Sequence, residues 1–384
     1  MGTSFAHDEG ATASFNYQAR FEEGLKSINE GRYLAASEIF SSLYSQTNSP
    51  RVKLEWARSL YLAGQKNQSE KLFKEVLDSD PPFMVKERIG GYLDDIAITK
   101  GKFDYSFGLM VDSNPRTITN SQVLNIFGQS FKYDPGFNRG NQLGLNYLLD
   151  GSKSLDDSEK IIGHFSVGGT KFDTSFFDKT SVQGDVTYRF SDEPRLQAKL
   201  GLERYYFGGK TLYDSPSIGL RHSSGDEAGG YWFTDLKTGQ MFYPEYSYMN
   251  GNLSSLTTSF GKPFFPGVTL GLELGIDRAR VNQNSYAFHT ETFSGVVNLI
   301  SVEYSLKSQI KLTGAYRKYG DADPIFGDTR IDRRNGIYLS FIKPNIKFFD
   351  LAPSIDLGWE KNNSNIEIYS YRRITTVFSL KKVY

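Results

Sequence analysis

Residues 302–317 read VEYSLKSQIKLTGAYR, and along this stretch apolar and polar side chains alternate. Successive side chains of a β-strand point to opposite sides, so alternation divides a strand into two faces. The mostly apolar face carries Val302, Tyr304, Leu306, Ser308, Ile310, Leu312, Gly314 and Tyr316. The polar face carries Glu303, Ser305, Lys307, Gln309, Lys311, Thr313, Ala315 and Arg317. The pattern predicts a strand over 302–317 with one apolar and one charged side.

The same alternation recurs from residue 101 to the C-terminus, whereas apolar residues before 101 recur at helical spacing. Clear examples lie at 103–111, 182–188, 196–202, 268–276 and 355–359. Many amphipathic strands in succession, separated by turn residues and rich in aromatics, are typical of transmembrane barrels. We therefore predict an α+β multidomain chain whose residues 101–384 form an antiparallel outer-membrane β-barrel. The segmentation favours about 14 strands, with twelve or sixteen as alternatives.

Composition agrees with a barrel and excludes several other classes. The mean hydropathy is −0.44, and no run approaches the roughly 20 apolar residues of a membrane-spanning helix. The 24 Tyr and 29 Phe residues suit the aromatic girdles of a barrel, although a soluble β-rich protein can also be aromatic-rich. The chain has no cysteine, so it has neither disulfides nor thiolate metal sites. Its 44 basic and 44 acidic residues balance, which gives no support to nucleic-acid binding.

Residues 1–15 are predicted to be a disordered N-terminal segment. The stretch MGTSFAHDEGATAS has neither the basic nor the apolar region of an export signal. Because an outer-membrane protein needs export, we expect a processed or truncated form with an added start methionine. The alternative is a cytoplasmic protein, which leaves the amphipathic strands unexplained.

Residues 16–100 contain a repeat with a period of 33 residues. The alignment pairs Gly24 with Ala57, Gly31 with Gly64, Ala36 with Ser69, Phe40 with Phe73 and Leu43 with Val76. Small residues, an inter-helix glycine and an aromatic at this spacing are typical of tetratricopeptide (TPR) repeats. A further helix opened by Pro81 and Pro82 presents Val85, Ile89, Leu93 and Ile96 on one face and is predicted to cap the array. Such arrays bind peptides or proteins in their groove, and the alternative is a spacer that recognises nothing.

Charged residues at the polar positions of the strands are predicted to face a hydrated lumen, because charge facing lipid is costly. The candidates are Asp185, Arg189, Arg195, Lys199, Glu203, Glu273, Asp277, Lys307, Lys311 and Asp356. A pore selective for one ion is expected to show a ring of one sign, whereas these residues carry both. Mixed charge fits a wet passage for a polypeptide or an internal salt-bridge network, and the sequence does not separate the two.

Turn lengths predict the topology of the barrel. If the first strand rises from the periplasm, every even-numbered connection is short. We place compact connections at Ser191–Pro194, Gly261–Gly267, Ser301–Val302 and Pro344–Asp350. We place longer connections at Asn114–Arg139, Phe207–Tyr213, Lys318–Asp332 and Lys361–Ile368. An even strand number returns Tyr384 to the periplasm, where a terminal aromatic acts as an insertion signal.

Three segments resemble the Slam family, the surface lipoprotein assembly modulators. They are the junction Asp80-Pro81-Pro82 with Val85 and Tyr92-Leu93-Asp94-Asp95-Ile96, the strand exit Val111-Asp112-Ser113-Asn114, and the C-terminal stretch from Asp332-Arg333-Arg334-Asn335 through Asn362-Asn363-Ser364-Asn365 to Tyr369-Ser370-Tyr371-Arg372-Arg373. The resemblance implies an outer-membrane translocon for surface lipoproteins or secreted proteins. It implies a periplasmic helical domain that binds the client or a periplasmic chaperone, and no cofactor.

Catalysis and metal binding have little support in the sequence. The four histidines, His7, His164, His222 and His289, are too scattered for a metal cluster. A hydrolase site is conceivable only around His289, with Ser285 and Glu291 nearby. Residues 320–332 hold four aspartates that can serve Ca²⁺ or pair with the local arginines. The aspartates are Asp321, Asp323, Asp328 and Asp332, and the arginines are Arg330, Arg333 and Arg334.

The sequence is also consistent with two other functions. A polysaccharide export porin also joins TPR repeats to a barrel, although usually with many more repeats. A passive porin tethered by its repeats needs no client at all.

Overall fold

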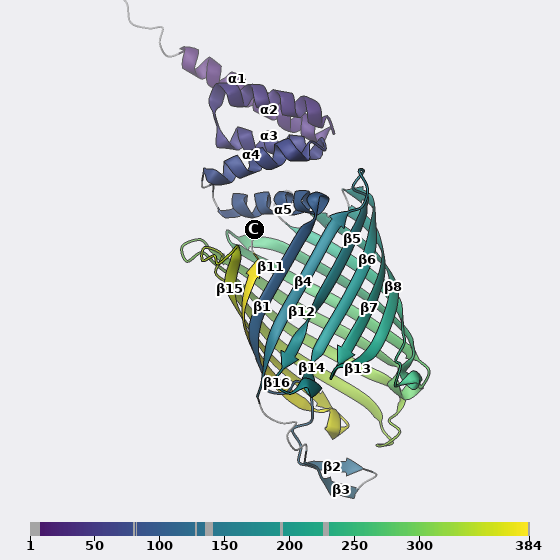
Figure 1. The fold of residues 1–384 in the computed structure, drawn as a ribbon. Helices are drawn as coiled ribbons and strands as arrows, with labels where there is room; N and C mark the ends of the chain where they lie inside the picture. Colours follow the sequence, from purple (N-terminus) through teal and green to yellow (C-terminus); the bar gives the residue numbers. More distant parts are fainter. Residues whose placement is uncertain are drawn as a thin grey trace, which may run out of the picture. The chain divides into compact units, whose positions relative to one another are not determined.

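The computed structural model describes residues 8–79, 81, 83–126, 129–134, 141–192, 195–225 and 230–382. The chain divides into two compact units, Met1–Lys100 and Gly101–Tyr384, which are the helical and the β-rich parts in Figure 1. This division coincides with the change of periodicity at residue 101.

Five helices make up the first unit: α1 (Asp8–Asn29), α2 (Tyr33–Thr47), α3 (Pro50–Leu62), α4 (Lys66–Asp78) and α5 (Phe83–Lys100). Residues 8–15 are therefore helical, whereas the sequence predicted disorder through residue 15. His7 and the predicted helix opener Pro82 lie outside the described residues. None of the described helices is both long and apolar enough to cross a membrane.

The packing of the helices follows the repeat. Ala36, Phe40, Ala57, Ser69 and Phe73 are all buried, as the alignment predicted. The Ser69 hydroxyl donates to the Ala57 carbonyl oxygen at 2.8 Å. Gly31 and Gly64, in the turns between the paired helices, have φ of 73° and 78°, a left-handed conformation that favours glycine.

Gly24 lets α1 and α2 approach, because a Cβ at this position would lie 2.5 Å from the Phe40 ring. We expect Gly24→Ala to destabilise the helical unit by roughly 1–3 kcal/mol through overpacking. The matched control is Gly90→Ala in α5, where a Cβ meets open space; there we expect about 1 kcal/mol of stabilisation from helix propensity. Thermal loss of the helical circular dichroism signal of the full chain distinguishes the two. Equal shifts in the same direction would contradict the close-approach argument.

Helix α5 covers the last repeat. Ile89 and Ile96 are buried in one core with Phe73, and Val85 and Leu93 pack against that core. The Tyr92 ring stacks on Phe73 with 5.0 Å between ring centroids. The predicted apolar face of this helix is therefore the face that packs.

Glu70 of α4 links the repeat to the end of α5. Lys100 and Lys74 both donate to its carboxylate, the latter at 2.7 Å. The bond from Lys100, followed by that from Lys74, lowers the pKa of Glu70 below its ordinary value. Because the folded pKa is depressed, the stabilisation is present above the unfolded pKa of about 4.3 and is lost as the pH falls through the folded pKa. We expect Glu70→Gln to reduce the fall in melting temperature of the helical unit between about pH 5 and 3. The same dependence of melting temperature on pH in the variant and the wild type would contradict this role of Glu70.

The second unit is a closed barrel of fourteen antiparallel strands. Its strands are β1 (Lys102–Asp112), β4 (Gln142–Ser154), β5 (Ile161–Phe172), β6 (Lys179–Asp192), β7 (Arg195–Phe207), β8 (Lys210–Gly225), β9 (Tyr231–Met241), β10 (Gly251–Phe265), β11 (Val268–Val281), β12 (Phe288–Ser301), β13 (Leu306–Ala322), β14 (Thr329–Ile342), β15 (Leu351–Ser364) and β16 (Tyr371–Lys382). β1 pairs with β4 on one side and with β16 on the other, which closes the ring. A separate hairpin of β2 (Val123–Ile126) and β3 (Gln129–Lys132) interrupts the connection after β1.

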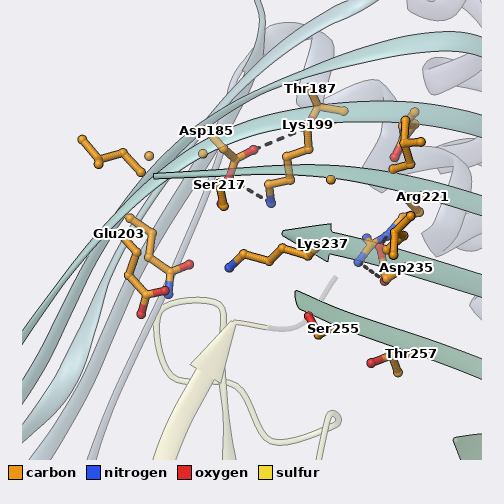
Figure 2. Close-up of a pocket in the computed structure, with 18 residues that line it drawn as sticks. Asp185, Thr187, Lys199, Glu203, Ser217, Arg221, Asp235, Lys237, Ser255 and Thr257 are labelled. Atoms are coloured by element: carbon orange, nitrogen blue, oxygen red, sulfur yellow. Dashed lines mark hydrogen bonds and ion pairs between the residues drawn. The ribbon is translucent and has the colours of Figure 1, made fainter. Parts of the chain in front are cut away.

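Alternation along the strands gives the barrel two chemically different faces. Opposed apolar side chains such as Leu109 and Leu145, or Leu236 and Leu256, share one face and are more than 40% exposed. The other face is largely polar and points to the barrel interior, as the side chains in Figure 2 do. Exposed apolar side chains around a closed sheet are the mark of a lipid-facing wall.

The connections differ in detail from the sequence prediction. Val302 and Tyr304 lie in a turn, and β13 begins at Leu306, so the predicted strand over 302–317 starts too early. The positive φ of Ser305, 46°, is incompatible with an extended strand. The predicted loose stretch Phe207–Tyr213 is a tight turn. Gly208 and Gly209 both have positive φ, which is the backbone of a type I′ hairpin turn.

Two other connections are shorter than predicted because the strands continue into them. The connection between β13 and β14 is residues 323–328, where Lys318–Asp332 was predicted, and that between β15 and β16 is residues 365–370, where Lys361–Ile368 was predicted. The compact turn after β10 is likewise shorter than Gly261–Gly267, since β10 runs to Phe265. Residues 193–194, part of Asn114–Arg139 and Tyr384 lie outside the described residues.

Candidate functional site: the inner wall of the barrel

All ten predicted lumen residues lie on the sheet face opposite to the exposed apolar side chains. The register shows this directly: Asp185 faces Gly201, Glu203 faces Ser215 and Asp277 faces Thr290, whereas Leu200 faces Ile218 on the other side. The ten do not form one cluster. Asp185, Lys199 and Glu203 line a common hollow, Glu273 binds Lys311 and Asp356 binds Lys381. Arg189, Arg195, Asp277 and Lys307 are not among the residues that line this hollow.

The common hollow is formed by β6 to β10 and has a volume of about 310 Å³. Figure 2 shows Lys199, Glu203 and Lys237 projecting into the same open space. Its charged lining consists of three carboxylates and three cations, so the formal charge is zero. These residues are Asp185, Glu203, Asp235, Lys199, Arg221 and Lys237. The hollow therefore offers both signs of charge and selects neither.

Sequence reasoning missed Arg221, Asp235 and Lys237 of this hollow. They come from β8 and β9, where Leu220 and Leu236 mark the outward positions. The same period-2 argument would have found them if these two segments had been read as strands. Arg221 binds Asp235 through two bonds of 2.7 Å, which is the bidentate arrangement of a strong pair.

His164 joins two of the carboxylates on this wall. Its Nδ1 lies 2.8 Å from Asp185 Oδ2, and its Nε2 lies 2.8 Å from Asp150 Oδ2. Lys199 also binds Asp185, at 3.0 Å. Side chains thereby join the four neighbouring strands β4, β5, β6 and β7, in addition to their backbone pairing. Much of the mixed charge thus serves to tie neighbouring strands together.

A second hollow lies on the inner wall of β12 to β16 and has a volume of about 190 Å³. Its lining includes three arginines but only one carboxylate: Arg317, Arg330, Arg334 and Asp332. Asp332 is buried and binds Arg330. This part of the wall is therefore more positive than the first hollow.

The acidic loop is occupied by protein contacts. Asp323 accepts bonds from the backbone N–H groups of Ile325 and Phe326 and from the Tyr369 hydroxyl at 2.8 Å. Burial, with this bond, raises the pKa of Tyr369 in its loop. Within the described parts of the chain, no group of three or more His, Asp or Glu side chains is arranged to hold a metal.

The arrangement around His289 does not form a catalytic triad. Its Nε2 lies 3.3 Å from Glu291 Oε1, and both side chains are exposed. The Ser285 hydroxyl instead receives a bond from Gln283 at 3.2 Å. Alternation on a strand explains the spacing of His289 and Glu291.

Comparison with solved structures finds porin-like barrels. An anion-selective porin from Comamonas acidovorans is 8% identical, with 74% of this chain and 100% of that chain covered and a TM-score of 0.41. A Pseudomonas aeruginosa FadL homologue is 9% identical, with 73% and 89% covered and a TM-score of 0.37. A bacterial polysaccharide outer membrane secretin is 11% identical, with 73% and 98% covered and a TM-score of 0.41.

Sequence comparison gives a more specific result. No curated protein matches the chain, but the model of the surface lipoprotein assembly modifier family matches residues 102–384. The match spans all fourteen strands of the barrel. The chain therefore belongs to the surface lipoprotein assembly modifier (Slam) family, with its β-barrel in the bacterial outer membrane.

Proposed function

We propose that this protein is a translocon that carries client surface lipoproteins or secreted proteins across the outer membrane. The main support is membership in the surface lipoprotein assembly modifier family. The first hollow of the inner wall adds a polar lining with three charges of each sign, which favours neither cations nor anions. A polypeptide carries both signs of charge, so such a wall neither traps nor repels it strongly. The mechanism needs no nucleotide or cofactor.

The helical unit is proposed to lie in the periplasm and to bind the client or a chaperone that delivers it. Supporting this role, its two repeats have the small-residue and aromatic packing of TPR units. TPR arrays present concave surfaces suited to extended chains. Outer-membrane lipid is the other partner, through the exposed apolar face of the barrel.

The test is co-expression with the lipoprotein encoded nearest to this chain's gene, followed by protease treatment of intact cells. We expect the lipoprotein to become protease-accessible only when this chain is present, with its total amount unchanged. Surface appearance of a polysaccharide instead would favour the export-porin alternative. Steady conductance with no effect on any lipoprotein would favour a passive porin.

A further inference from the structure

The segment Ser113–Ser121, here called the strap, directly follows β1 at the end of the barrel away from Lys102, here called the distal end. Strap residues Asn114 and Thr119 are 6% and 1% exposed, and Pro115 is fully buried. Connecting segments normally run over the surface and stay exposed. The strap is instead packed against the rest of the barrel.

The strap reaches inward-facing residues on opposite walls. Lys179 at the start of β6 donates to the Pro115 carbonyl oxygen at 2.6 Å. Two residues further on, Thr117 lines the second hollow together with Arg317 of β13. In the closed order of fourteen strands, β6 and β13 are seven strands apart, so they stand on opposite sides of the ring. A segment that is bonded to β6 and that lines a hollow on the wall of β12 to β16 extends over the distal opening of the lumen.

The side chain of Arg116, in the middle of the strap, packs against two aromatic rings of the barrel. The Arg116 guanidinium lies over the Phe176 ring at 4.0 Å and the Phe207 ring at 5.5 Å. These rings belong to the turn after β5 and to the end of β7. Cation–π contact at these distances is attractive and occupies space next to β6. Arg116 thus packs the strap against the turn after β5 and the end of β7.

Polar bonds hold the strap in this position. The Asn114 side chain binds both the N–H and the carbonyl of Ile118, at 2.9 and 2.7 Å. Thr119 donates to the Glu367 carbonyl oxygen at 2.8 Å, and Asn120 accepts from the Arg372 N–H at 2.7 Å. Thr117 has a φ of 56°, which a β-branched residue adopts only when its surroundings hold it. Hydrogen bonds thus hold the strap in one defined position, here called its seat, and water or a passing chain can replace these bonds.

We infer that the strap is a gate that closes the distal end of the lumen at rest and leaves its seat when a client passes. Closure of the lumen at rest is inferred from the contacts described above. Release of the strap when a client passes rests on the proposed function. Single-channel conductance tests closure of the lumen without a client, whereas display of a lipoprotein tests its passage. Failure of the gate and failure of the proposed function can therefore be distinguished.

The first experiment compares single-channel conductance of the full chain in planar bilayers. We expect small, rare openings for the wild type and a several-fold larger mean conductance for the double variant Asn114→Ala with Thr119→Val, which removes the side-chain bonds of these two residues to Ile118, Arg372 and Glu367. The matched control is Asn250→Ala, which removes a similar bond, to the Tyr243 N–H at 2.6 Å, from the connection between β9 and β10. A wild type that is already as conductive as the double variant would overturn the closure, as would an equal rise in the control.

The second experiment locks the strap and does not depend on the stability of the first variant. Because the chain has no cysteine, Thr119→Cys with Glu367→Cys forms the sole thiol pair, and non-reducing electrophoresis reports the bond; a short bifunctional thiol reagent replaces it if oxidation is incomplete. We expect the crosslinked form to abolish protease-accessible display of the neighbouring lipoprotein, and reduction to restore it when a disulfide was formed. Equal display by crosslinked and uncrosslinked protein would overturn the gate. If the wild type displays no lipoprotein, the proposed function fails, while the conductance comparison still decides the closure.

Discussion

Removal of residues Asn16–Lys100 is expected to abolish client display while the barrel remains inserted in the outer membrane. The two units each have their own core, since the buried residues of the helical unit contact one another in two clusters within residues 21–96. The barrel strands pair among themselves from β1 to β16. Deletion therefore removes the proposed binding surface without removing any strand of the barrel.

The measurement is protease accessibility of the lipoprotein on intact cells, with heat-modifiable migration of the barrel on gels as the control for insertion. A milder companion is Gly24→Ala, which loosens the first repeat and leaves the chain length unchanged. We expect partial loss of display for this variant and complete loss for the deletion. Unchanged display by an inserted, truncated barrel would contradict the capture role of the helical unit.

Substitution of Asp112 by alanine is expected to weaken the barrel at the seam between its first and last strands. The Asp112 side chain is fully buried, and it binds the Arg373 guanidinium through two nitrogens. It also accepts the Asn114 N–H at 2.9 Å. Removal of Asp112 leaves the Arg373 guanidinium, which is 24% exposed, without this partner. Loss of one partner of a fully buried pair costs about 3–5 kcal/mol, so we expect a loss toward the lower end of that range. The backbone pairing at this seam is short: β1 pairs with β16 over Ser106–Asp112, but with β4 over Lys102–Asp112. The seam therefore depends more on side-chain contacts such as this one.

The control is Glu245→Ala at the same end of the barrel. Glu245 binds Lys210 at 3.0 Å, but both side chains are largely exposed. Exposed pairs contribute roughly 0–1 kcal/mol, so we expect little effect. Thermal unfolding in detergent, followed by the loss of heat-modifiable migration, compares the two variants. Similar melting temperatures for Asp112→Ala and the wild type would show that the buried pair does not hold the seam.

Local patterns in the sequence were sufficient for the class of fold. The period of 2 after residue 101 identified the strands and their two faces, because lipid on one side and water on the other leave few acceptable side chains for each position. The 33-residue repeat identified the small and aromatic residues that the helices bury. The same alternation placed Asp185, Lys199 and Glu203 on the polar face. Strand ends were less predictable, as the early start assigned to β13 shows, since alternation continues through a turn such as 302–305.

The sequence by itself therefore determined that residues 101–384 build a barrel with a polar interior, and that a helical unit with a 33-residue repeat precedes it. Tertiary structure alone decided which charges meet. Asp112 and Arg373 lie at opposite ends of the barrel sequence and become neighbours only when β1 pairs with β16. In the sequence, the strap is likewise an ordinary polar loop, because nothing local in residues 113–121 encodes its bond to β6 or its place beside the hollow of β12 to β16. Closure of the barrel brings strands that are distant in the sequence within reach of one segment. The alternation of neighbouring residues carries no information about how the barrel closes.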